Sequence, residues 1–184
     1  MQELSLNVLD VAQNSIAAGA RLIEIEMLEN KAENTLSISI NDDGKGMDEV
    51  AVKQVTDPFY TSRTTRKVGL GVPFFKMASE QTGGSFSISS ALGKGTKVLA
   101  TFKTDSIDFT PVGNMCQTVE ILINLNPDLD FVYTHKIDEN AFCVDTRQLR
   151  KVLGNDVALN DMDVVMWIRS YLEEQTRLIN GEVG

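Results

Sequence analysis

The stretch LSISINDDGKGM, residues 36–47, decides the fold. Every second side chain in its first half is apolar, and a period of two predicts a strand with one buried face. The strand runs directly into Asp42 and then into a turn that contains Gly44 and Gly46. Because glycine lets the backbone approach a ligand closely, this turn indicates either a site for a small polar ligand or an ordinary surface turn.

The residues on both sides of this stretch predict alternating helices and strands. A short helix is expected after Asp48, and residues 57–69, which lack a period and carry several basic side chains, are expected to form a mobile loop. The remaining predictions up to residue 110 are helices over 4–18 and 70–82 and strands over 22–27, 85–90 and 96–104. Beyond it we predict strands over 119–125 and 131–137, joined at 126–128, and helices over 145–153 and 161–180.

Composition places the chain among ordinary globular proteins and argues against several classes of partner. Its 184 residues are 42% hydrophobic and 23% charged, with a net charge of −9. Nucleic acids and anionic membranes bind basic surfaces, so neither is the expected partner. No signal peptide or membrane-spanning run is visible, and two cysteines are too few for a disulfide framework. We therefore expect a cytoplasmic protein.

Two polar residues of the first predicted helix, Asp10 and Asn14, are four positions apart and therefore project from one face. The polar face of any amphipathic helix would give the same pattern. Their chemistry is nevertheless suggestive, because a carboxylate can accept a proton and an amide oxygen is a hard ligand that suits magnesium.

Two further glycine motifs follow along the chain. Gly69-Leu70-Gly71 opens a predicted helix, where free backbone N–H groups and the helix dipole favour phosphate, and Arg63, Arg66 and Lys67 lie just upstream. A plain loop–helix junction is the alternative. Gly93-Lys94-Gly95-Thr96 predicts a tight hairpin, with the question open whether Thr96 also faces a ligand.

Each motif is weak alone, but their order and spacing resemble the GHKL ATPase superfamily, which comprises gyrase, heat-shock chaperone, histidine kinase and MutL-type proteins sharing the Bergerat nucleotide fold. The resemblance covers about residues 4–104. Residues 9–20 look most like the MutL type, whereas residues 57–71 look most like the histidine kinases, so the branch stays open.

The resemblance implies a role for each motif. Asn14 would ligate the magnesium ion, Asp42 would accept the adenine amino hydrogen, and residues 59–68 would form the ATP lid. Asp10 occupies the position of the general base in the hydrolysing branches. The residues assigned to nucleotide binding are Asn14, Asp42, Gly44, Gly46, Arg63, Lys67, Gly69, Leu70, Gly71 and Thr96.

The fold expected from these features is a two-layer α/β sandwich, with a mixed, mostly antiparallel sheet and helices on one face. Residues 1–110 would form the ATP-binding domain and residues 111–184 a small α/β extension. The expected function is binding of Mg-ATP or ADP, with hydrolysis of ATP or transfer of its γ-phosphate. A protein serine kinase of the anti-sigma-factor type and a nucleotide-dependent partner-binding switch with negligible turnover are the alternatives.

The C-terminal residues suggest contact with a protein partner or with a second copy of the chain. Residues 1–110 carry 11 basic and 14 acidic side chains, whereas residues 111–184 carry 6 and 12. His135, the one histidine, falls in a predicted strand without a following acid, which favours an ordinary structural histidine over a phosphate acceptor. On the last predicted helix, the spacing of Trp167, Ile168 and Leu172 indicates core packing or a partner-facing seam.

Overall fold

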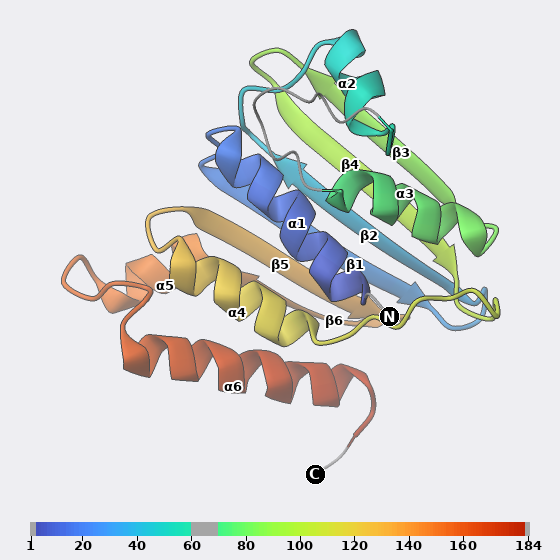
Figure 1. The fold of residues 1–184 in the computed structure, drawn as a ribbon. Helices are drawn as coiled ribbons and strands as arrows, with labels where there is room; N and C mark the ends of the chain where they lie inside the picture. Colours follow the sequence, from blue (N-terminus) through green and yellow to red (C-terminus); the bar gives the residue numbers. More distant parts are fainter. Residues whose placement is uncertain (1–2, 60–69, 183–184) are drawn as a thin grey trace.

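The computed structural model describes residues 3–59 and 70–182, which form six strands and six helices (Figure 1). Those in the N-terminal part are α1 (Leu4–Ala17), β1 (Leu22–Asn30), β2 (Thr35–Asp42), α2 (Glu49–Val55), α3 (Gly71–Gln81), β3 (Ser85–Ala91) and β4 (Gly95–Lys103). Those that follow are α4 (Met115–Leu125), β5 (Asp130–Ile137), β6 (Asn140–Asp145), α5 (Thr146–Leu153) and α6 (Met162–Ile179).

The strands form one six-stranded sheet in the order β3-β4-β2-β1-β5-β6. All neighbouring strands are antiparallel except β1 and β5, which run parallel. Helices α1, α3 and α4 lie against one face of this sheet (Figure 1). The predicted fold class, a two-layer sandwich with a mixed and mostly antiparallel sheet, is confirmed.

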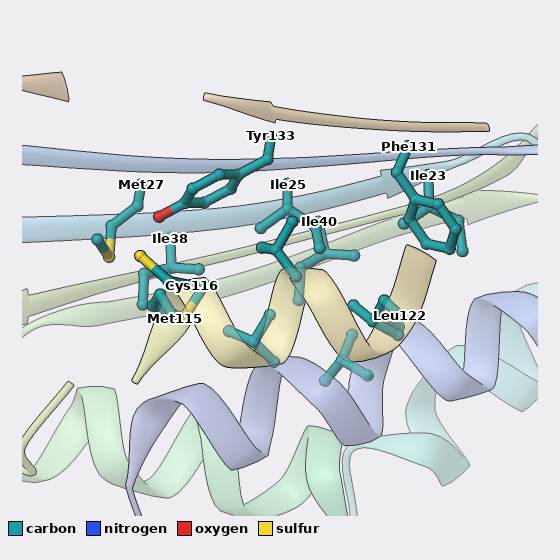
Figure 2. Packing of buried hydrophobic residues seen from close by; sticks show 14 of the residues in the cluster. Ile23, Ile25, Met27, Ile38, Ile40, Met115, Cys116, Leu122, Phe131 and Tyr133 are labelled. Atoms are coloured by element: carbon teal, nitrogen blue, oxygen red, sulfur yellow. The ribbon is translucent and has the colours of Figure 1, made fainter. Parts of the chain in front are cut away.

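Period-two burial creates the single core between the two layers. Ile25 and Met27 of β1 and Ile38 and Ile40 of β2 are buried, while Glu26, between Ile25 and Met27, is exposed on the other face. Figure 2 shows the inward side chains of the strands pointing toward α4. Removing this apolar area from water is the main stabilising contribution to the sandwich.

The predicted strand over residues 119–125 is wrong, because this segment belongs to helix α4. The helix begins earlier than the predicted strand, and Asn114 caps it by accepting a hydrogen bond from the backbone N–H of Gln117 (2.9 Å). Its buried residues include Met115, Val119 and Leu122, which recur at helical spacing. The β-branched run in its second half imitates a strand when it is considered without that first turn.

Strand β6 was not predicted, and it replaces residues 119–125 as the hairpin partner of β5. The chain reverses between the two strands at Asp138, whose positive φ of 51° permits the tight turn. Phe142 and Val144 of β6 are buried. Through β5 and β6 the residues after 110 extend the sheet of the residues before it, and the division at residue 110 stays a prediction.

Helix α6 is attached to the sandwich by burial and by one bidentate ion pair. Ile168 and Leu172 are fully buried, and the Arg169 guanidinium donates to both carboxylate oxygens of Glu120 on α4, at 2.6 and 2.8 Å. Bidentate geometry fixes orientation as well as distance. Trp167 is 51% exposed and its ring stacks on that of Tyr171, so this residue faces outward.

Candidate nucleotide-binding site

The first part of the candidate site is the place where α3 begins against α1. A β-carbon at Gly71 would lie 2.5 Å from the β-carbon of Asp10, so no larger residue fits between the helices. The N-cap residue of α3, Leu70, supplies no side-chain hydrogen bond. The first backbone N–H groups of a helix have no partner within it, and the dipole places positive charge there. The geometry therefore suits a phosphate group beside Asp10.

Asp10 is half-buried where the two helices meet. Burial raises the pKa of its carboxyl group above the ordinary value, because a partly dehydrated site disfavours the charged form. A carboxylate in such a place is a stronger base than one on the open surface. The structure thus brings together the two predicted site residues Asp10 and Gly71.

Asn14 lies one helical turn after Asp10 on the same face of α1. Its side-chain nitrogen is buried and finds no acceptor within residues 3–59 and 70–182. An unpaired buried amide is costly unless a ligand supplies the partner. Among these residues no group of three or more histidines, cysteines or acids could hold a metal ion. The unpaired atom is an N–H donor, which a phosphate oxygen would satisfy, and the amide oxygen of the same side chain is the atom that could ligate magnesium.

The second part of the site lies at the end of β2. Asp42 is 7% exposed, and its carboxylate accepts hydrogen bonds from the Ser15 hydroxyl (2.6 Å) and from the Gly44 backbone N–H (2.9 Å). Asp43 points elsewhere and accepts from the backbone N–H groups of Arg21 and Leu22. Asp43 therefore fixes the start of β1, whereas Asp42 lies under α1.

Thr96 lies beside Asp42 because the two residues are direct partners across strands β2 and β4. The Thr96 hydroxyl is 2.9 Å from the hydroxyl of Ser90, which is its partner across β3 and β4. The Ser90 hydroxyl also accepts a hydrogen bond from the backbone N–H of Met47 (2.8 Å). Polar groups of three strands are thus gathered at one end of the sheet.

The glycine turn after β2 packs closely on the β3–β4 hairpin. A β-carbon at Gly46 would collide with the backbone carbonyl of Ala91, and its φ of +68° also favours glycine. The Gly93 N–H donates to the Lys45 carbonyl across the same contact (2.7 Å). A β-carbon at Gly44 would press on Asp42 and Ala18. The assignment of Gly44 and Gly46 to nucleotide binding stays a prediction.

The other predicted site residues fare differently. Leu70 is described and 42% exposed, whereas Arg63, Lys67 and Gly69 lie outside the described residues. Ser15 and Ser90 were not predicted, because the contact of Ser15 with Asp42 and that of Ser90 with Met47 join residues 27 and 43 positions apart. His135 is buried in β5, as expected for a structural histidine, and its Nε2 lies 2.9 Å from Glu29.

Residues 1–106 match the family of histidine kinase-, DNA gyrase B- and HSP90-like ATPases. The chain belongs to this family. It is 38% identical over 101 residues to the sensor protein SrrB of Staphylococcus aureus (strain NCTC 8325 / PS 47), a match that covers 52% of the chain. The match spans 17% of the length of that relative, so the relative's whole activity does not transfer to this chain.

Two solved structures share the fold. The N-terminal domain of a DNA repair protein aligns with a TM-score of 0.53 and 17% identity, covering 79% of this chain and 52% of that one. The Aquifex aeolicus MutL ATPase domain complexed with ADP aligns with a TM-score of 0.51 and 12% identity, covering 83% and 68%. Both alignments extend beyond the 106 residues that match the family. At these identities the likeness concerns the fold alone.

In the part of the chain that the structure describes, no helix is both long and apolar enough to cross a membrane.

The raised pKa of Asp10 gives a prediction about stability. Because the protonated form is favoured in the folded state, ionisation of Asp10 destabilises the fold above the ordinary carboxyl pKa of 3.8. Asp10→Asn should therefore raise the free energy of unfolding at pH 7, and the gain should shrink as the pH falls toward 4. Urea unfolding of both proteins at several pH values measures this difference. A gain that is the same at pH 4 and pH 7 would contradict the assignment.

Proposed function

We propose that this chain binds Mg-ATP and Mg-ADP between α1, α3 and the end of β2, and that it hydrolyses ATP or transfers its γ-phosphate. The observation that carries the proposal is the arrangement along α1. Ser15 of this helix contacts Asp42 at the end of β2, while Asp10, on the same helix, meets the start of α3. One helix therefore connects Asp42, a carboxylate suited to a nucleobase, with a helix N-terminus suited to phosphates.

At the end of the site that holds the nucleobase, Asp42 accepts a hydrogen bond from the adenine 6-amino group. Thr96 completes this pocket directly or through water. A carboxylate presents acceptors only, which matches an amino group and repels a keto oxygen at the same position. Adenine is therefore preferred over guanine. Gly44 allows the base to approach the turn.

At the phosphate end, the backbone N–H groups at the start of α3, including that of Gly71, bind the phosphate oxygens. The backbone N–H of Gly69 joins these donors, and Arg63 and Lys67 of the proposed ATP lid, residues 59–68, add positive charge. Asn14 holds the magnesium ion, which neutralises charge on the phosphates when it is bound.

Asp10 acts as the general base. When water or a hydroxyl attacks phosphorus, its proton must leave as the new bond forms, and a carboxylate of raised pKa beside the phosphate can take it. A histidine nitrogen would need no such base. Asp10 therefore favours water, or a serine or threonine hydroxyl, as the acceptor over a histidine.

A nucleotide-dependent partner-binding switch is the second candidate, and the outer face of α6 favours it. Met162, Met166 and Trp167 are 77%, 60% and 51% exposed on this helix. Large apolar side chains gathered in this way are typical of surfaces that contact another protein. In this case residues 111–184 bind the partner or a second copy of the chain, in the cytoplasm, and ATP controls the contact with little turnover.

The assignment of Asp42 to the adenine pocket predicts the effect of Asp42→Ala on ATP binding. Loss of a hydrogen bond to a charged group costs about 2 kcal/mol, so ATP affinity should fall at least about tenfold. Titration calorimetry with Mg-ATP and Mg-GTP measures both affinity and selectivity, and Asp43→Ala is the matched control because that acid contacts β1 instead. Unchanged ATP affinity in folded Asp42→Ala, or equal affinity of the parent for GTP, would contradict the adenine pocket.

The general-base assignment predicts the effect of Asp10→Asn on turnover. The amide keeps the shape of the side chain but cannot take a proton, so turnover should fall about 100-fold while ATP affinity stays within a few-fold. Incubation with γ-labelled ATP, following free phosphate and labelled protein separately, measures the rate and identifies the acceptor. Equal turnover of variant and parent, or label on His135, would reject the role. A parent without turnover would favour the switch.

A further inference from the structure

The Ser15 hydroxyl has a contact that the nucleotide assignments leave unexplained. Ser15 is 4% exposed, and its Oγ lies 2.6 Å from Oδ2 of Asp42 but 3.5 Å from the carbonyl oxygen of Val11. A hydroxyl carries one hydrogen, so the short contact identifies Asp42 as its acceptor. Hydrogen bonds to a charged carboxylate are shorter and stronger than those between neutral groups.

The carboxylate of Asp42 is held from two sides. Ser15 donates to Oδ2 from α1, and the Gly44 N–H donates to Oδ1 at 2.9 Å from the turn. Together these two donors, on separate elements, oppose rotation of the carboxylate. Each oxygen still has a second acceptor position, so the carboxylate can accept one more hydrogen in a fixed direction.

We propose that Ser15 is a positioning residue that sets the selectivity of the pocket for a purine with a 6-amino group. The proposal rests on the proposed adenine pocket and concerns how Asp42 is aimed. Because the Ser15 hydroxyl hydrogen is donated to Asp42, the Asp42 carboxylate faces the pocket as an acceptor in a fixed orientation. Without the hydroxyl, the carboxylate keeps one protein donor and turns toward water, and alignment with the amino group is lost.

Ser15 also stands next to Asn14, and Asp10 lies in the previous turns of the same helix. Its bond to Asp42 therefore also links the helix that carries these residues to the end of β2. A buried cross-link with only a structural role would stabilise the fold without discriminating between bases. Base selectivity therefore separates the two roles.

The test compares ATP with purine riboside triphosphate, which lacks the 6-amino group, by calorimetry in the presence of Mg²⁺. Ser15→Ala should weaken ATP binding about tenfold and the analogue less than twofold, because only ATP uses the aimed oxygen. Ser15→Thr, which keeps the hydroxyl, should retain the selectivity of the parent. Ser5→Ala is the matched control, since Ser5 is a second buried serine of α1 and should leave the selectivity unchanged.

Each outcome supports or overturns the proposal. Equal losses for both nucleotides in Ser15→Ala, or lost selectivity in Ser15→Thr, would overturn it and leave a structural cross-link. If Ser15→Ala does not fold, Ser15→Cys replaces it. The thiol is a weak donor, so lost selectivity in Ser15→Cys supports the proposal and retained selectivity overturns it. A parent that binds neither nucleotide would instead reject the proposed function itself.

Discussion

Helix α1 packs on the inner face of the sheet against β2, and the candidate site depends on this contact. Leu4, Val8 and Val11 are fully or almost fully buried, and they fix which face of the helix meets the sheet. Since side chains repeat every 3.6 residues, that choice also directs Asp10 toward the start of α3 and Ser15 toward Asp42. Burial of one apolar stripe thus orients the polar residues at both ends of the site.

Glycine determines how closely the other elements approach this helix. Gly71 lets the start of α3 lie against Asp10, and Gly46 lets the turn after β2 lie against the β3–β4 hairpin. Any β-carbon at these two positions would push the elements apart. The phosphate end and the base end therefore depend on different glycines, whose contacts are independent of each other.

The sequence predicts some of these features better than others. Buried and more exposed side chains alternate along β1 and β2, and Asp10 and Asn14 are four residues apart on one helix. Both patterns follow from local rules, so the strands, the first helix and its polar face were predictable. Helix α4 was mistaken for a strand because its β-branched second half alternates locally, and the cap at Asn114 that starts it was overlooked. The bond between Ser15 and Asp42 joins residues 27 positions apart and becomes visible only when α1 is placed on β2.

The most direct test is a crystal structure of the chain with Mg²⁺ and a non-hydrolysable ATP analogue. The adenine 6-amino nitrogen should lie about 3 Å from the Asp42 carboxylate, the hydrogen-bond distance. Phosphate oxygens should lie on the first N–H groups of α3, and the Asn14 side-chain oxygen on the metal. A nucleotide bound with its base away from Asp42, or with its phosphates away from Gly71, would contradict the proposed site.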